Sequence, residues 1–269
     1  MEILYPNNFA KLFSTMLLVF QLFSDLNHTK DFNRESVSSI VWYQKSAEAK
    51  ALYLQGYNIA ISRLIEIRNN KPSETNLAVV LDIDETILDN SPFQAKLAYS
   101  FQNYNNILWS KWTSQKNADL LPGVARFFTV ADSLGFEIFL VSNRYDYEQE
   151  VTLENLQRFK LPGLNEENIF LRKFESSKKD RRDTILSSYS IELLLGDNLG
   201  DFDDVFDTKS LEEREMNVMK NADKFGSKFI IFPNPMYGSW DDLLYKNTES
   251  SRSSETKSSM RKEVLKRSN

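Results

Sequence analysis

Short apolar segments recur through the middle of the chain, separated by stretches in which apolar residues follow helical spacing. Each segment is rich in Ile, Val, Leu and Phe, a composition typical of strands buried on both faces. The segments lie at residues 77–83, 136–141, 168–171, 191–195 and 228–232. Between them, residues 124–134 and 148–159 have the periodicity of helices. This alternation predicts βα units, and therefore an α/β fold with a doubly wound parallel sheet.

The two flanks of this region differ in pattern. Residues 36–69 place apolar side chains at helical spacing, interrupted only by Gly56, and predict a long helix packed on the core. From residue 247 onward Ser, Lys, Arg and Glu dominate, which predicts a disordered, solvated tail over 247–269. The folded domain is therefore expected to span residues 36–246.

The N-terminus carries one lysine followed by a mostly apolar stretch at residues 12–23, which is too short for a comfortable membrane span. We interpret residues 1–24 as a secretion signal, which predicts a secreted, periplasmic or otherwise extracytoplasmic protein. Residues 22–24 lack the small-x-small cleavage pattern. An uncleaved segment that anchors the protein to a membrane, and a plain amphipathic helix, therefore stay open.

Composition narrows the chemistry. The chain has 269 residues, 41% of them hydrophobic, which is enough for one sizeable core. A net charge of −5 argues against a nucleic-acid polymer as partner but not against a small anionic substrate. Cysteine is absent and the one histidine is His28, so thiol and imidazole nucleophiles and Cys/His zinc sites are excluded from the domain. The chemistry that remains for this domain is that of carboxylates, and a bound metal is expected to be a hard, oxygen-bound cation such as Mg²⁺.

Two carboxylates end the first predicted strand. Asp82 and Asp84 are spaced i, i+2, which puts both side chains on one face of an extended chain. Like charges so close are costly unless a cation or a reacting group uses them. An EF-hand loop does not fit, because Ile87 and Phe93 stand where its glycine and its bidentate Glu belong. A plain turn that caps the next helix through Thr86 stays open.

Polar residues also follow two other predicted strands. Ser-Asn-Arg at 142–144 follows the second strand, and Gly-Asp-Asn at 196–198 follows the fourth. Ligands of doubly wound sheets bind outside the carboxyl ends of the strands. With Lys178 and Lys179, these groups supply a nucleophile, hydroxyl and amide donors, a cation and metal ligands, the set that phosphoryl transfer requires.

The order of these motifs resembles the haloacid dehalogenase (HAD) superfamily, and within it the class C acid phosphatases, relatives of the bacterial lipoprotein e. The resemblance implies a HAD-like, Rossmann-like core with a small helical cap. A lipidated cysteine, found in the lipoprotein relatives, is missing here. The motifs are Trp42-Tyr-Gln-Lys-Ser-Ala-Glu48, Leu81-Asp-Ile-Asp-Glu-Thr-Ile-Leu-Asp-Asn-Ser-Pro92, Val141-Ser-Asn-Arg144, Ser176-Ser-Lys178, Gly196-Asp-Asn-Leu-Gly-Asp-Phe202 and Pro233-Asn-Pro-Met-Tyr-Gly-Ser-Trp240.

The resemblance implies a role for each acidic residue. Asp82 attacks phosphorus and forms an aspartyl-phosphate, while Asp84 protonates the leaving oxygen and then deprotonates the hydrolytic water. Thr86 either orients Asp84 through its hydroxyl or caps the following helix. Mg²⁺ is expected on the Asp82 side chain, the Asp84 backbone carbonyl and Asp197, with Asp201 either near the ion or holding Lys178.

Phosphate binding follows from the same resemblance. Ser142 and the backbone of Asn143 are expected to donate hydrogen bonds to the phosphoryl oxygens, and Lys178 to neutralise their charge. The neighbouring cations are expected to form a solvated basic face. These cations are Lys179, Arg181 and Arg182.

Residues 87–121 form an insertion rich in aromatic residues, which predicts a small helical cap over the site. The resemblance implies nucleoside monophosphates among the substrates, with aromatic rings stacked on the base. Trp109 and Trp112 of the insertion, and Tyr237 of the 233–240 loop, are candidates for stacking, and packing within the fold is the alternative for each.

Together these patterns predict a secreted, Mg²⁺-dependent acid phosphatase of the 5′-nucleotidase type, which hydrolyses small phosphomonoesters through an aspartyl-phosphate intermediate. Two alternatives stay open. The chain can transfer the phosphoryl group to an alcohol, or it can be a non-catalytic surface-binding or storage protein on a HAD scaffold. The sequence leaves membrane association through the N-terminus and a homodimer open.

Overall fold

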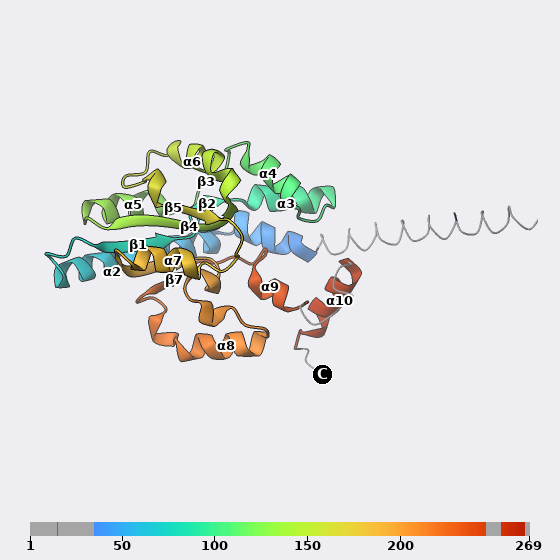
Figure 1. Cartoon of the computed structure of the whole chain (residues 1–269). Helices are drawn as coiled ribbons and strands as arrows, with labels where there is room; N and C mark the ends of the chain where they lie inside the picture. Colours follow the sequence, from blue (N-terminus) through green and yellow to red (C-terminus); the bar gives the residue numbers. More distant parts are fainter. Residues whose placement is uncertain (1–14, 16–34, 246–253, 267–269) are drawn as a thin grey trace, which may run out of the picture.

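A five-stranded parallel sheet forms the centre of the protein (Figure 1). The computed structural model describes residue 15, residues 35–245 and residues 254–266. The strands lie in the order β5-β4-β1-β6-β7, so β1 is central. Their bounds are β1 Leu77–Leu81, β4 Glu137–Tyr145, β5 Ile169–Arg172, β6 Ser190–Gly196 and β7 Phe229–Ile231. The predicted doubly wound α/β fold is therefore confirmed.

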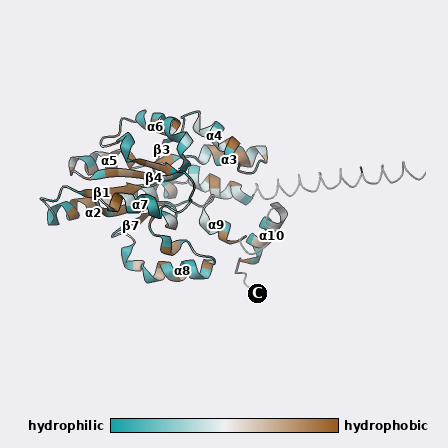
Figure 2. Ribbon diagram, viewed as in Figure 1, coloured by the Kyte–Doolittle hydropathy of each residue, from teal (hydrophilic) through white to brown (hydrophobic). Residues whose placement is uncertain are grey.

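Two core layers, one on each face of the sheet, fix this arrangement. Leu77, Val79 and Leu81 of β1 pack into one layer with helices α2 (Ala47–Asn70) and α5 (Val124–Ser133). Ala78 and Val80 point into the other layer, which includes Ile185 of α7 (Lys179–Leu186) and two phenylalanines after β6. All five residues of β1 are buried, as expected for a strand covered on both faces. Figure 2 shows the matching pattern, with hydrophobic colour concentrated on the central strands.

Helices and short 3₁₀ turns connect the strands. On the α2 side of the sheet, α5 leads into β4 and α6 follows it, and on the other side α7 and α8 flank β6. The helices are α5 Val124–Ser133, α6 Gln149–Gln157, α7 Lys179–Leu186, α8 Leu211–Lys220 and α9 Ser239–Leu243. The 3₁₀ helices are η1 Asp146–Glu148, η2 Glu166–Asn168, η3 Leu199–Asp201, η4 Asp204–Phe206 and η5 Ala222–Lys224.

The predicted long N-terminal helix is divided, but not at the glycine. Residues 35–45 are helical, the helix breaks at Ser46, and α2 spans Ala47–Asn70. The Ser46 hydroxyl accepts a hydrogen bond from the Ala49 backbone N–H and so caps α2. Gly56 lies buried inside α2, against the ring of Phe232. A glycine in a helix pattern therefore marks a close approach here rather than an interruption.

The insertion after β1 folds into a small cap. Strand β2 (Leu88–Asp89) pairs antiparallel with β3 (Asp119–Leu120), and this two-stranded ribbon holds helices α3 (Ser91–Ser100) and α4 (Asn106–Thr113) between its strands. Phe93 of α3 packs against the two tryptophans of α4. Three of the six aromatic residues of the insertion therefore pack together, whereas Tyr99, Phe101 and Tyr104 are exposed.

The C-terminal segment differs from the predicted solvated tail. Helix α10 spans Ser254–Glu263, and Arg261 on it forms an ion pair with Asp241 of α9 at 2.8 Å. Ser258 donates a hydrogen bond to Glu35, which lies near the N-terminal end of the domain in the sequence. These contacts join residues distant in the sequence, so local composition does not reveal them.

The predicted secretion signal at residues 1–24 lies outside the described residues, apart from Thr15. Within the described ranges, no helix combines the length and the apolar character needed to cross a bilayer. The N-terminal assignment accordingly stays a prediction.

We expect Gly56→Ala to destabilise the fold by about 1–3 kcal/mol, because an added Cβ would lie 2.6 Å from Cε1 of Phe232. That ring is held between Tyr53 and Tyr57, with centroid distances of 5.1 and 4.6 Å, so it has little room to move. Helix propensity alone would make the alanine variant more stable by up to about 1 kcal/mol. The sign of the change in unfolding free energy therefore shows whether propensity or the clash with Phe232 is larger. Urea unfolding measures it, with the exposed Gln55→Ala as the control; a more stable Gly56→Ala variant would contradict the packing.

Candidate active site

β1 lies between β4 and β6 and runs parallel to both. The carboxyl ends of these three strands therefore lie side by side at one edge of the sheet. A cavity of about 1070 Å³ opens there. It is lined by Asp82 and Asp84 after β1, by Ser142 of β4 and by Asp197 after β6. The site therefore lies where doubly wound sheets bind their ligands.

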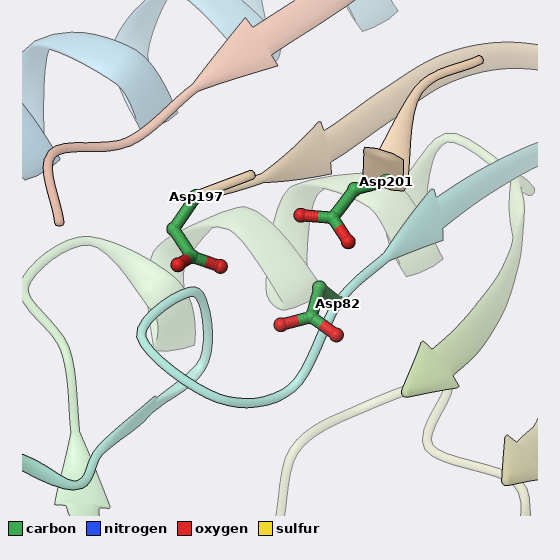
Figure 3. Close-up of side chains that lie close together, drawn as sticks. All are labelled: Asp82, Asp197 and Asp201. Carbon is green, nitrogen blue, oxygen red and sulfur yellow. The ribbon is translucent and has the colours of Figure 1, made fainter. Parts of the chain in front are cut away.

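Three carboxylates that line this cavity lie close together (Figure 3). Asp82, Asp197 and Asp201 each offer an oxygen, and these oxygens lie within 4.8 Å of one another. Burial raises the pKa of Asp82 to about 7, with Lys178 opposing the shift and the carboxylates of Asp201 and Asp84 adding to it. Burial, followed by Asp201 and Asp82, raises the pKa of Asp197 well above its usual range. The negative charge of these carboxylates is thus only partly balanced by Lys178.

Lys178 bridges two members of the cluster from the start of α7. Its ammonium group is buried, lies 2.6 Å from Oδ1 of Asp201 and donates a second hydrogen bond to Asp82. Burial disfavours the charged ammonium, but Asp201 and Asp82 outweigh that effect and raise the pKa of Lys178. The lysine therefore stays charged beside the predicted nucleophile, and Asp201 holds it there, one of the two roles predicted for Asp201.

Asp84 is oriented by residues that the sequence analysis did not assign. Arg144 donates to it through Nε at 3.0 Å and Nη2 at 2.7 Å, and Asn90 donates through Nδ2 at 2.8 Å. Thr86 was predicted as one candidate for this role, but its buried hydroxyl has no hydrogen-bond partner among the described residues. Arg144 could have been found from the sequence, because it stands two residues after Ser142 and so on the same face of β4.

The predicted phosphate-binding residues lie on β4 and at the start of α7, and one arginine joins these two places. Ser142 is fully buried, whereas Asn143 is exposed at the rim of the cavity. Arg181 donates to the Ser142 carbonyl at 2.5 Å and to Oδ1 of Asn143 at 2.7 Å, and it also reaches the Ser177 carbonyl at 3.1 Å. It thereby fixes the C-terminal part of β4 against the residue preceding Lys178.

The prediction of a solvated basic face is consequently wrong for two of its three residues. Arg181 is half-buried in these contacts, and Arg182 is buried, where it donates to the carbonyls of Gly200 and Asp201. Only Lys179 is exposed, and it pairs with Asp183 one helical turn away. Backbone carbonyls of β4 and η3 hold the two arginines, and periodicity within α7 does not show such partners.

The sequence also matches a known family over most of its length. Residues 25–240 match the family described as HAD superfamily, subfamily IIIB (Acid phosphatase). The chain belongs to this family. The resemblance read from the motifs, and the enzyme class of phosphomonoesterases that it implied, are thus confirmed.

Solved and curated proteins that are similar to this chain include two acid phosphatases. The structure is similar to the crystal structure of the class C acid phosphatase from Bacillus anthracis with tungstate bound, with a TM-score of 0.82 and 37% identity, covering 89% of this chain and 100% of that one. A stem 28 kDa glycoprotein from Glycine max is 32% identical over 43% of this chain. Acid phosphatase 1 from Solanum lycopersicum is 26% identical over 38% of it. The matches span 42% of the length of each of these two curated relatives.

One loop after β7 supports the acidic cluster. Asn234 donates from Nδ2 to Asp197 at 2.8 Å, and its Oδ1 accepts from the backbone N–H of Met236 at 3.0 Å. This second contact folds the loop so that Tyr237 reaches the cavity wall. Sequence reasoning named the loop but missed Asn234, because its partner lies 37 residues away.

The three aromatic candidates for substrate stacking occupy different places. Tyr237 is half-buried and lines the cavity. Trp109 also lines it, although 8% of its surface is exposed and its ring packs edge-on against Phe93. Trp112 does not line the cavity: its ring stacks on Phe93 and its indole N–H donates to Asn90 at 2.8 Å. Trp112 is therefore a packing and hydrogen-bonding residue of the cap.

The acidic cluster fits a divalent metal ion. Carboxylate oxygens are the ligands that hard cations prefer, and three of them lie within reach of one point. Burial is the main cause of the raised pKa values of Asp82 and Asp197, and the neighbouring carboxylates add to it, so a cation between them would favour the charged forms of both groups.

We expect Mg²⁺ to stabilise the chelator-treated protein by about 2.7 kcal/mol at a concentration one hundred times its Kd. Because the pKa of Asp82 is raised in the folded chain, its contribution to stability is present at low pH and is lost as the pH rises through about 7. The stabilisation by Mg²⁺ should therefore be larger at pH 8 than at pH 5. Thermal unfolding with and without Mg²⁺ measures both effects.

The matched variants for this test are Asp197→Asn in the cluster and Asp183→Asn on the surface of α7. We expect Asp197→Asn to lose most of the stabilisation and Asp183→Asn to keep it. Equal responses of the two variants would place the cation elsewhere.

Proposed function

We propose that the protein is a Mg²⁺-dependent acid phosphatase that hydrolyses small phosphomonoesters, including nucleoside 5′-monophosphates. The observation that carries the proposal is the position of Asp82. Its carboxylate lies at the end of β1 and lines the cavity, in contact with the Lys178 ammonium and beside the carboxylates of Asp197 and Asp201. A nucleophile, a fixed cation and a metal-binding cluster therefore face one substrate-sized space.

The proposed reaction has two steps. In the first, Asp82 attacks phosphorus as the bond from phosphorus to the leaving oxygen breaks, and Asp84 gives that oxygen a proton. In the second, Asp84 takes a proton from a water molecule that attacks the aspartyl-phosphate, which releases phosphate and restores Asp82. Ser142 and the Asn143 backbone would donate hydrogen bonds to the phosphoryl oxygens, and Lys178 would balance their charge.

Asp82, Asp197 and Asp201 would hold the Mg²⁺ ion, with the Asp84 backbone carbonyl. The ion would supply positive charge next to the phosphoryl oxygens. The bound tungstate of the Bacillus anthracis relative supports an oxyanion site in this fold, because tungstate and phosphate are both tetrahedral oxyanions. An acidic pH optimum follows from the need for a proton on Asp84 in the first step.

Two further parts of the proposal concern context. An extracytoplasmic location rests on the apolar stretch at residues 12–23, and a membrane anchor or a homodimer is compatible with it. A storage or surface-binding role without catalysis is the alternative, and the retention of Asp82, Asp84, Ser142 and Lys178 around one cavity argues against it. Transfer to an alcohol in place of water uses the same residues and differs only in the acceptor.

We expect Asp82→Asn to lower kcat for p-nitrophenyl phosphate by at least about a thousandfold, because the amide cannot form the aspartyl-phosphate. Exhaustive chelation should abolish the wild-type rate, and added Mg²⁺ should restore it. Asp183→Asn serves as the surface control. Full activity after chelation would remove the metal from the mechanism, and an Asp82→Asn rate above about a tenth of wild type would show that the nucleophile is misassigned.

We expect Tyr237→Ala to raise KM for nucleoside 5′-monophosphates by about 5- to 160-fold, because losing one stacking ring costs about 1–3 kcal/mol. The KM for a small alkyl phosphate should change far less. Trp109→Ala is expected to act in the same direction, whereas Tyr147→Ala, which removes a ring that is 64% exposed, should leave both constants unchanged. Parallel changes for both substrates would mean that these rings support only the fold.

A further inference from the structure

Asn90 occupies an unusual position for its side chain. It is the N-cap residue of α3, where an asparagine usually accepts a hydrogen bond from the first backbone N–H groups of the helix. Its side chain makes no such bond here, and Asp89 accepts from the Ser91 N–H instead. The Asn90 side chain is fully buried and reaches Asp84 and Trp112. The Asn90 amide therefore does not cap α3 and instead contacts Asp84 and Trp112.

The contact with Trp112 fixes which way this amide faces. An indole N–H can only donate, so the atom that meets it at 2.8 Å must be the amide oxygen of Asn90. The amide nitrogen then necessarily faces Oδ1 of Asp84, also at 2.8 Å. A flipped amide would set two donors against each other at Trp112 and two acceptors against each other at Asp84. One tryptophan of the cap therefore determines the donor that Asp84 receives.

The backbone on either side of Asn90 is fixed as well. The Asn90 N–H donates to Oε1 of the buried Glu85 at 2.8 Å, and the Glu85 N–H donates to the Leu88 carbonyl at 2.9 Å. Glu85 itself has a positive φ of 55° between Asp84 and Thr86. The loop from Asp84 to Asn90 is thus closed by its own hydrogen bonds, and Asn90 cannot shift without moving Asp84.

These contacts distinguish the two oxygens of Asp84. Oδ1 accepts from Asn90 at 2.8 Å and from Nη2 of Arg144 at 2.7 Å. Oδ2 has longer contacts, with Nε of Arg144 at 3.1 Å and with the Ser142 hydroxyl at 3.5 Å. A proton on Oδ1 would displace one of these two short hydrogen bonds, whereas a proton on Oδ2 would compete only with the longer contacts, and Nε of Arg144 also lies 3.0 Å from Oδ1. Oδ2 is therefore the oxygen suited to carry the proton.

We infer that Asn90 is a positioning residue for Asp84, which turns Oδ2 toward the leaving group, and that Trp112 of the cap fixes the amide of Asn90 for this purpose. The inference rests on the proposed function, since it assumes that Asp84 is the general acid. It extends that function by assigning a role to two residues outside the set of groups that touch the substrate. The cap then contributes to proton transfer through α4 as well as enclosing the cavity.

The test compares kcat/KM, at saturating Mg²⁺, for p-nitrophenyl phosphate and for ethyl phosphate. The ethyl ester needs a proton on its leaving oxygen, and the nitrophenyl ester does not. We expect Asn90→Ala to lower kcat/KM for ethyl phosphate at least about tenfold more than for the nitrophenyl ester. Trp112→Phe keeps a ring against Phe93 but removes the N–H, and it should shift the ratio in the same direction by a smaller factor.

Asn155→Ala is the matched control. Asn155 is also a buried asparagine, and its amide holds both the N–H and the carbonyl of Ala118 at the base of the cap. We expect Asn155→Ala to lower thermal stability as Asn90→Ala does, without changing the ratio between the two esters. If Asn90→Ala does not fold, Trp112→Phe carries the comparison alone, because its ring remains in place.

Asp84→Asn separates the inference from the proposed function. If Asp84→Asn shows the selective loss on ethyl phosphate and neither Asn90→Ala nor Trp112→Phe does, Asn90 is not a positioning residue and the inference is overturned. If only Asn90→Ala shows it, the role of Trp112 is overturned. If Asp84→Asn itself loses both esters equally, Asp84 is not the general acid, and the proposed mechanism fails together with the inference.

Discussion

The crowding of carboxylates at the end of β1 is the constraint on which the site depends. Asp82, Asp84, Asp197 and Asp201 lie around one cavity, and two buried cations, Lys178 and Arg144, contact them. The formal charges of these six side chains leave an excess of two negative charges on groups that are mostly buried. Burying unpaired charge costs several kcal/mol per ion. A divalent cation would cancel these two negative charges. The charge of the site therefore matches the Mg²⁺ ion of the proposed reaction.

The two central carboxylates are supported by different parts of the protein. Asp82 follows β1 directly, and its backbone N–H donates to the Leu195 carbonyl of β6, so the sheet itself fixes the nucleophile. Asp84 lies two residues further, in the loop that leads to the cap, and side chains fix it through Arg144 and Asn90. A nucleophile on a rigid strand and a proton donor on a loop held from two sides suit their tasks, since the acid must serve both a leaving group and a water molecule.

Sequence reasoning succeeded where the signal is local. The strand at 77–81 is apolar throughout, and the i, i+2 spacing places Asp82 and Asp84 on the same side of the chain that follows it. The order of strand-end motifs then located Ser142, Lys178 and Asp197 at one edge of the sheet, because parallel strands end together. These features depend on periodicity and chain direction, and both can be read without knowing any long-range contact.

The remaining features depend on partners that are far away in the chain. The orientation of the Asn90 amide is set by Trp112, 22 residues later in the chain. The position of Arg181 is likewise set by its hydrogen bond to the carbonyl of Ser142, 39 residues earlier. The same holds for Gly56, which is small because Phe232 approaches it and not because the helix ends. In each case a residue type with an ordinary local interpretation takes its role from a distant contact. Residues that position a catalytic group by such contacts are therefore harder to predict from sequence than the catalytic group itself, whose chemistry is visible in its side chain.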